Sequence, residues 1–260
     1  MSNLHWTTAV TKIGPNEIRV KGFRIEDAME HLTFAQMIYL LLTGELPDEK
    51  IGRLMDIILV SSVDHGATPP SCLVARTSAS TGAPLNAALA AGILTINDFH
   101  GGAIHDCMLI LKKAKSIMKV EALSLSKAAE KIVSNYRSEK KRINGFGHRI
   151  HSNDPRKVKL FSMASDLGLS GEYVEMALAI EKALADATGK NLPINVDGAI
   201  AALLCDLKIP VELANAFFIM ARLPGLVAHI YEEQTREKLM RKIDPTDHSY
   251  DGPGDREIKG

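Results

Sequence analysis

The spacing of hydrophobic positions changes near the start of the chain, after about residue 21. Two short runs rich in β-branched residues come first, over Thr7–Ile13 and Glu17–Val20, and they flank Gly14-Pro15-Asn16. Glycine, proline and asparagine are residues that a tight turn favours. The pattern therefore predicts a small β-hairpin over residues 6–21.

Beyond this hairpin, hydrophobic residues recur at helical spacing along most of the chain. Ile25–Leu42 is the first such segment, and Gly44 with Pro47 is expected to end it. The last segment contains Pro224-Gly225, where a residue without an N–H is expected to break the helix. Further helices are predicted over 49–63, 71–81, 84–96, 102–115, 121–137, 156–167, 170–188, 196–206 and 211–240. The predicted fold class is mainly α.

Composition narrows the class of protein. The chain has 260 residues, 46% of them hydrophobic, with 31 basic and 31 acidic side chains and no net charge. This balance is typical of a soluble globular protein and argues against a general nucleic-acid binder. No apolar run approaches the ~20 residues of a membrane helix, and we expect no secretory leader and no membrane partner. Three widely spaced cysteines without a CxxC pair favour a cytoplasmic location.

Charge is concentrated in one segment of this neutral chain. Residues 137–159 hold eight Lys or Arg side chains against two acidic ones, an excess of six positive charges. The segment surrounds Gly145-Phe146-Gly147-His148, whose glycines would let a ligand approach the backbone. Most charge runs are solvated faces, but this combination favours an anionic ligand. No aromatic platform accompanies the charges, so nucleic acid is not predicted.

Four residues are candidates for chemistry. His65, His100 and His148 each lie beside a glycine, where a substrate could come close to the main chain. Asp197 opens a very apolar helical segment, where desolvation would raise its proton affinity toward that of a useful base. Simpler alternatives stay open, namely Asp197 as a helix N-cap and His100 as an ordinary histidine at a helix start.

Seven short motifs occur in one order along the chain: Gly44-Glu45-Leu46-Pro47, Asp64-His65-Gly66, Ala79-Ser80-Thr81, His100-Gly101-Gly102-Ala103, Gly145-Phe146-Gly147-His148-Arg149, Asp154-Pro155-Arg156 and Asn195-Val196-Asp197. Together they resemble the citrate synthase superfamily, over about residues 7–253. Only 16 residues separate Pro47 from Asp64, where full-length citrate synthases have a much longer segment. This shortening resembles citryl-CoA lyases and the lyase module of ATP-citrate lyase. That module lacks a histidine at the position of His100, so the chain combines lyase-like length with a synthase-like triad.

The resemblance implies a citrate-synthase-like multi-helical fold with a large helical core, a small closing lobe and the short N-terminal β-hairpin. Residues 1–145 are then the first part of the large domain. Residues 146–222 are the small lobe that closes over CoA and substrate, and residues 223–260 return to the large domain and end in an arm. A frayed tail would have the same polar composition as that arm.

The resemblance also implies a catalytic triad of His100, His148 and Asp197. When acetyl-CoA condenses with oxaloacetate, Asp197 removes a methyl proton, His100 stabilises the enolate and His148 polarises the ketone. Cleavage of citryl-CoA reverses these steps, so the triad alone does not set the direction. Citryl-CoA lyase is the favoured function, with a short citrate or methylcitrate synthase as the alternative. No metal and no covalent cofactor is implied, and the CoA thioester is the substrate.

Two groups of binding residues follow from the motif positions. Substrate carboxylates are expected to accept charge-assisted hydrogen bonds from His65, Arg156, Arg222 and Arg241. The last of these resembles an arginine that relatives contribute from a neighbouring subunit, which implies at least a homodimer; ordinary ion pairs are the simpler interpretation of the other arginines. CoA is expected to lie on Lys140, Lys141, Arg142, Ile143, Asn144, Gly145, Phe146 and Gly147. The implied ligands are citryl-CoA, acetyl-CoA and oxaloacetate.

Two functions of other classes stay open. A non-catalytic helical subunit would bind CoA or a partner enzyme without turnover. The other is a metal-dependent hydrolase, which would use His100, His105, His148, His151 and Asp154. Glycines and Pro155 interrupt the segment that carries the last three of these residues, and an HExxH motif is absent. Cys107 and Cys205 are interpreted as small core residues.

Overall fold

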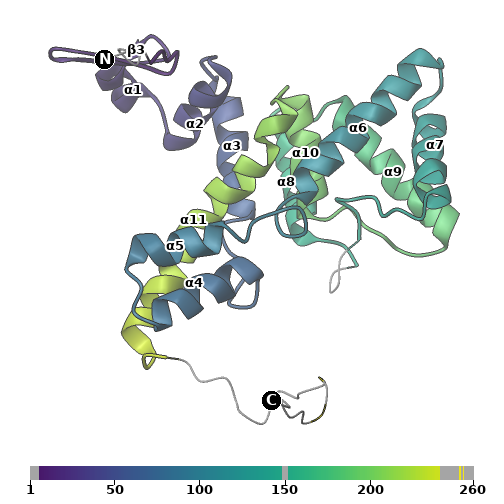
Figure 1. Ribbon diagram of the computed structural model, residues 1–260. Coiled ribbons are helices and arrows are strands. Elements are labelled where there is room, and N and C mark those ends of the chain that lie inside the picture. The colour runs from purple at the N-terminus through teal and green to yellow at the C-terminus, as the bar shows by residue number, and fades with distance from the viewer. Residues whose placement is uncertain (1–5, 148–151, 241–251, 253, 255–260) are drawn as a thin grey trace, which may run out of the picture.

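The computed structural model describes residues 6–147, 152–240, 252 and 254, and it is mainly helical (Figure 1). Its N-terminal part is an antiparallel sheet formed in this order by β1 (Thr11–Gly14), β2 (Glu17–Val20) and β3 (Phe23–Arg24). Thr11 pairs with Val20 across the first hairpin. The predicted hairpin is confirmed, although its first strand begins at Thr11 rather than Thr7, and β3 was not predicted.

Eleven α-helices and one 3-10 helix follow within the described residues. They are α1 (Ile25–His31), α2 (Phe34–Thr43), α3 (Glu49–Ser61), α4 (Pro70–Ser80), α5 (Leu85–Ile93), α6 (Ala103–Val120), α7 (Leu125–Ser138), α8 (Pro155–Asp166), α9 (Glu172–Thr188), α10 (Val196–Asp206), η1 (Val211–Leu213) and α11 (Ala214–Arg236). Helical periodicity therefore predicted nearly all of the helices, with two departures.

The first departure is that the single helix predicted over Ile25–Leu42 is two helices. Leu32 and Thr33 have extended backbones between α1 and α2. The Thr33 hydroxyl accepts a hydrogen bond from the Gln36 amide, and the Gln36 side chain accepts one from the Thr33 amide. This capping box starts a new helix, so the prediction of one continuous helix was wrong.

The second departure is α11, which continues through Pro224-Gly225, where a break was predicted. A proline inside a helix removes one backbone hydrogen bond, so packing has to offset the loss. Gly225 allows close packing: a Cβ added there would lie 2.3 Å from the Val63 carbonyl oxygen. The loop after α3 therefore lies directly against α11.

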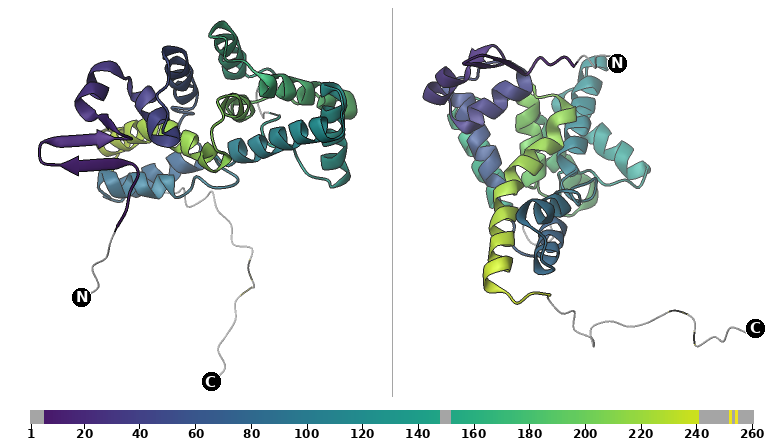
Figure 2. Two further views of the ribbon diagram at one scale, coloured as in Figure 1. Left: turned by 90° about the horizontal axis from the view of Figure 1, so that it is seen from above. Right: turned by 60° about the vertical axis from the view of Figure 1, so that its left-hand side comes forward.

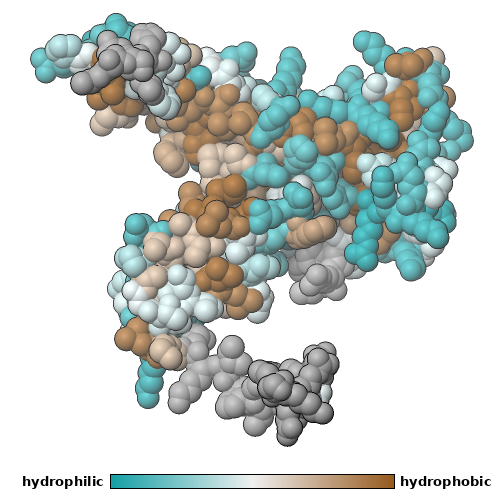
Figure 3. Space-filling model, viewed as in Figure 1, coloured by the Kyte–Doolittle hydropathy of each residue, from teal (hydrophilic) through white to brown (hydrophobic). Residues whose placement is uncertain are grey.

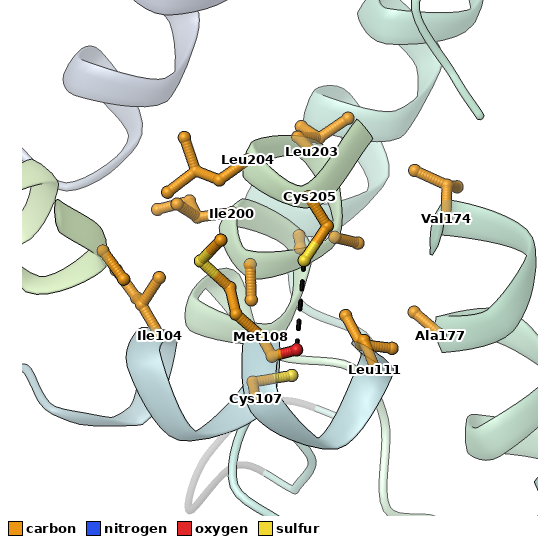
Figure 4. Packing of buried hydrophobic residues seen from close by; sticks show 14 of the residues in the cluster. Ile104, Cys107, Met108, Leu111, Val174, Ala177, Ile200, Leu203, Leu204 and Cys205 are labelled. Carbon is orange, nitrogen blue, oxygen red and sulfur yellow. Dashed lines mark hydrogen bonds between the residues drawn. The ribbon is translucent and has the colours of Figure 1, made fainter. Parts of the chain in front are cut away.

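The helix α10 lies in the main hydrophobic core, where nine of its eleven residues are buried. It packs on α6, α8 and α9. Figure 4 shows Cys107 and Cys205 among the aliphatic side chains of this core, and both thiols are buried and free. Their interpretation as small core residues is confirmed. The first turn of α10 therefore lies at the edge of the hydrophobic core, from which water is excluded.

A second, smaller core joins α4, α5 and the later turns of α11. Figures 1 and 2 show α11 running from the main core to this smaller one, with the N-terminal sheet at an edge of the molecule. By length and composition alone, Val211–Arg236 could cross a membrane, and 44% of its apolar window is buried. Core helices of soluble proteins meet the same criterion, and α11 also contacts α3 and α6.

Candidate active site

Asp197 lies in the first turn of α10, but it does not cap the helix. The N-cap is Asn195, whose side-chain oxygen accepts a hydrogen bond from the Gly198 amide at 3.1 Å. The alternative of Asp197 as N-cap was therefore wrong. Its Oδ1 is buried and has no hydrogen-bond partner among the described residues. Burial raises the pKa of Asp197 to about 6, against the opposing charges of Arg156 and Arg222.

Arg222, from the middle of α11, is buried, with 3% of its surface exposed. Its Nε donates to the Ser62 carbonyl oxygen at 3.0 Å, and its guanidinium carbon lies 4.7 Å from the centre of the Phe218 ring. Within the described part of the chain, no carboxylate forms an ion pair with it. A buried guanidinium held by Nε and an aromatic face keeps its two terminal nitrogens for an anionic ligand.

His100 lies in the turn before α6. Its main chain exchanges two hydrogen bonds with Asn97, and its Nε2 lies 2.9 Å from the Ser71 hydroxyl oxygen. The imidazole also packs edge-on against Phe218, the ring that Arg222 covers. Burial and the charge of Arg222 lower the pKa of His100, which favours the neutral ring. A neutral histidine held by Ser71 can donate a hydrogen bond to a thioester oxygen.

Arg156 is held in place by Asp154, a fully buried carboxylate. Arg156 donates to it from Nε at 3.0 Å and from Nη2 at 2.9 Å. The same carboxylate accepts the Val196 amide at 3.1 Å, which ties the start of α8 to the start of α10. Burial alone would raise the pKa of Asp154, but these hydrogen bonds hold it below its ordinary value.

His65 is exposed on the loop after α3. Partial burial lowers the pKa of its imidazole, and the charges of Arg156 and Arg222 lower it further. The same two charges also act on Asp197, so His65 and Asp197 both lie within electrostatic reach of Arg156 and Arg222. The structure therefore brings together His65, Arg156, Arg222 and Asp197 from four different segments, and Arg222 also acts on His100.

The segment predicted to bind CoA runs beside this group. Ile143 and Gly145 are buried, whereas Lys140, Lys141 and Arg142 are exposed. Lys141 pairs with Glu139 at 2.7 Å. Asn144 donates to Asp106, the first acidic residue of α6. The segment is therefore anchored by its later residues and presents its basic residues to solvent.

Some predicted residues cannot be placed in this way. His148 of the triad and Arg241 lie outside the described residues, as does His151. Among the residues that are described, no group of three or more His, Cys, Asp or Glu side chains could hold a metal ion. His105 lies 3.2 Å from Asp106, and His229 lies 3.0 Å from Asp64.

The sequence predicted no role in the site for Ser71 or Asn195, and it predicted Asp154 only as a residue of the alternative metal-dependent hydrolase. Ser71 orients His100, Asp154 holds Arg156, and Asn195 caps the helix that carries Asp197. The signal for Asp154 was available, because an aspartate directly before a proline at a helix start is a common N-cap pattern. Nothing in the sequence shows that Ser71 meets His100, since they are 29 positions apart.

The arrangement suits proton transfer beside an anion. A carboxyl group with a pKa of about 6 can exchange a proton near neutral pH. Arginine side chains can bind carboxylates, and a neutral histidine can stabilise an enolate oxygen. These are the requirements for making or breaking a carbon–carbon bond next to a thioester.

The chain is similar to a known protein family. Residues 47–243 match the family model described as Citrate synthase, C-terminal domain. Citrate synthases of Synechocystis sp. and Haloferax volcanii are each 30% identical over 82% of this chain, and over 52% and 54% of their own lengths. The chain therefore spans about half the length of the curated citrate synthases that it matches.

Solved structures extend the comparison. Citryl-CoA lyase from Hydrogenobacter thermophilus superposes with a TM-score of 0.90 at 40% identity, over 98% of this chain and 97% of that chain. ATP citrate lyase from Methanothrix soehngenii, in complex with citrate and coenzyme A, shares the fold with a TM-score of 0.84 at 24% identity, over 100% of this chain and 44% of that one. The predicted citrate-synthase-like fold is confirmed. The chain belongs to the citrate synthase family.

Proposed function

We propose that the protein is a citryl-CoA lyase, which cleaves citryl-CoA to acetyl-CoA and oxaloacetate. The observation that carries the proposal is the similarity to a citryl-CoA lyase over 97% of that protein. The polar groups around Asp197 supply what the reaction needs, namely cations for carboxylates and a titratable acid.

In this proposal His148 accepts the hydroxyl proton of the citryl group as the ketone of oxaloacetate forms. The carbon–carbon bond then breaks, and its electron pair passes into the thioester as an enolate. His100 donates a hydrogen bond to the enolate oxygen. Protonated Asp197 transfers its proton to the enolate carbon, which completes acetyl-CoA.

Binding follows from the same residues. We propose that Arg156, Arg222 and His65 bind the carboxylates of the substrate, with Arg241 supplied by a second subunit. Lys140, Lys141 and Arg142 lie at the exposed entry of the segment 140–147, where the phosphates of CoA would be attracted. CoA is a substrate moiety in this scheme, without a resident cofactor.

A second candidate is a short citrate synthase, which would hydrolyse citryl-CoA to citrate and free CoA. The curated relatives at 30% identity named citrate synthase favour it. Incubation of the purified protein with citryl-CoA, with product analysis, separates the candidates. Acetyl-CoA with oxaloacetate supports the lyase, citrate with CoA supports the synthase, and CoA binding without turnover supports a binding subunit.

We propose a cytoplasmic homo-oligomer in which residues 146–222 close over the ligand and exclude water. In this scheme residues 1–145 and 223–260 form the large domain, and the segment 140–147 lies at the junction. The main core contains residues from both sides of this junction, so closure would have to act through the loops around it.

A further inference from the structure

The segment that ends the predicted CoA-binding region is paired with the segment that leads into α10. The Gly147 amide donates to the Pro193 carbonyl at 2.7 Å, and the Asn195 amide donates to the Gly145 carbonyl at 3.0 Å. Phe146 and Ile194 form an antiparallel bridge between these two hydrogen bonds. The main chain of Gly145–Gly147 is therefore fastened directly to the start of the helix that carries Asp197.

The Asn195 side chain joins the same two parts a second time. Its Nδ2 donates to the Gly147 carbonyl at 3.0 Å, while its Oδ1 accepts from the Gly198 amide at 3.1 Å. One amide group thus holds the loop with its donor and caps α10 with its acceptor. Asp197 lies within the turn that this cap closes.

The two parts are in close contact at two glycines. A Cβ on Gly198 would lie 2.2 Å from the Gly145 carbonyl oxygen, and a Cβ on Gly145 would lie 2.9 Å from the Gly198 Cα. Gly145 also has a φ of 88°, which favours glycine. We expect a displacement of the loop to shift the first turn of α10 as well, because close-packed atoms transmit displacements.

We propose that Asn195 is a positioning residue that couples occupation of the 140–147 segment by the CoA anion to the placement of the Asp197 carboxylate. The inference rests on the proposed function, because it takes CoA as the ligand of that segment. Lys140 and Arg142 bind the phosphates of CoA, which restrains the segment. The hydrogen bonds of Asn195 then transmit this restraint from Gly145–Gly147 to the first turn of α10. The acid is then placed correctly only when the thioester is bound.

The test separates the two roles of the Asn195 amide. Serine caps helices as well as asparagine, so Asn195→Ser keeps an acceptor for Gly198 but cannot also reach the Gly147 carbonyl. We expect its thermal midpoint to stay within ~2 °C of wild type, because the cap survives. Citryl-CoA turnover should fall about 10- to 100-fold through misplacement of Asp197. The Kd for CoA should rise about 2- to 10-fold, the effect of one hydrogen bond.

A second readout does not depend on turnover. Hydrogen exchange with and without CoA should show that CoA protects the amides of residues 196–199 in wild type, and that Asn195→Ser loses this protection. Ser124→Ala, which removes the N-cap of the remote helix α7, is the matched control and should leave the protection intact.

The outcomes are distinct. If wild type protects these amides with CoA but does not cleave citryl-CoA, the coupling stands and the proposed function fails. If Asn195→Ser keeps both turnover and protection, Asn195 is only a helix cap and the coupling is wrong. The proposed coupling is also wrong if CoA does not protect these amides in the wild-type protein.

Discussion

The buried carboxyl group of Asp197 destabilises the folded protein, but it is suited to proton transfer. Its Oδ1 is buried without a partner among the described residues, and burial raises its pKa to about 6. At pH 7 the folded protein therefore holds a desolvated carboxylate that water would stabilise better. A stable core has no need of such a group, so its presence beside Arg156 and Arg222 favours a role with substrate.

Loss of the Asp197 carboxyl group should impair catalysis. Asp197→Asn should lower kcat for citryl-CoA cleavage about 10²- to 10⁴-fold, because the proton donor is lost. Cleavage starts from protonated Asp197, so kcat/KM for citryl-CoA should fall as pH rises through about 6. Condensation of acetyl-CoA with oxaloacetate starts from the carboxylate form of Asp197, so its kcat/KM should rise over the same pH range. Near-wild-type turnover of Asp197→Asn in a steady-state assay would remove Asp197 from the mechanism.

The second prediction concerns stability. The folded pKa of Asp197, about 6, lies above the ordinary 3.8, so the folded state binds more protons between these values. The contribution of Asp197 to the free energy of unfolding therefore falls as pH rises from about 4 to 6. Asparagine does not ionise, so Asp197→Asn lacks this loss and should be more stable than wild type by about 3 kcal/mol at pH 7.5. Urea unfolding at pH 4 and 7.5 checks this, and a constant difference between variant and wild type contradicts it.

The third prediction concerns Arg222. Lysine cannot keep the Nε contact to Ser62 and present two further donors. Arg222→Lys should therefore raise KM for the carboxylate substrate about 10- to 100-fold, the effect of lost hydrogen bonds to a charged group. Steady-state kinetics measures it, with Arg236→Lys, exposed near the end of the same helix, as the control. An unchanged KM would show that Arg222 is only structural.

At the level of elements, local signals explain most of the helices and also the two errors. The capping box of Thr33 and Gln36 was present in the sequence as Thr-x-x-Gln, and the continuous apolar pattern concealed it. Pro224 was expected to break α11 because helix propensity is local. Packing of Gly225 against Val63, 162 positions earlier in the chain, was not visible from sequence.

This contact gives a prediction at the element scale. Alanine is normally favoured over glycine inside a helix by about 1 kcal/mol. At position 225 the added methyl would meet the Val63 carbonyl at 2.3 Å and push away the loop that bears His65. Gly225→Ala should therefore lower the thermal midpoint and raise KM, whereas Val227→Ala, partly exposed on the same helix, should change KM little. A more stable Gly225→Ala variant would show that the loop moves freely.

At the scale of the whole molecule, apolar surface is unevenly distributed. Figure 3 shows brown surface gathered around α2 and α3 and around α5, while the region of α6, α7 and α9 is mostly teal. Exposed apolar side chains on the paired helices α4 and α5 include Leu73 and Leu85. Monomers rarely expose large apolar patches, so this region is where we place the predicted subunit contact.

Size-exclusion chromatography with light scattering should give at least a dimer for wild type. Leu85→Glu, at a side chain 46% exposed, should shift the protein toward monomer, because a charge would be buried in the contact. Val120→Glu at the end of α6, outside the apolar surface, is the control, with 81% exposure. A wild-type monomer with full citryl-CoA turnover would contradict both the contact and the shared Arg241.

The mainly α class, the hairpin and nearly all of the helices could be predicted from the sequence, because periodicity, turn residues and caps act over a few positions. Its motifs also led to the family that the comparisons established. The burial of Asp197, the hydrogen bond from Arg222 to the Ser62 carbonyl and the double role of Asn195 became visible in the folded chain alone. Those properties depend on burial and on contacts between segments up to 160 positions apart, which local patterns do not encode.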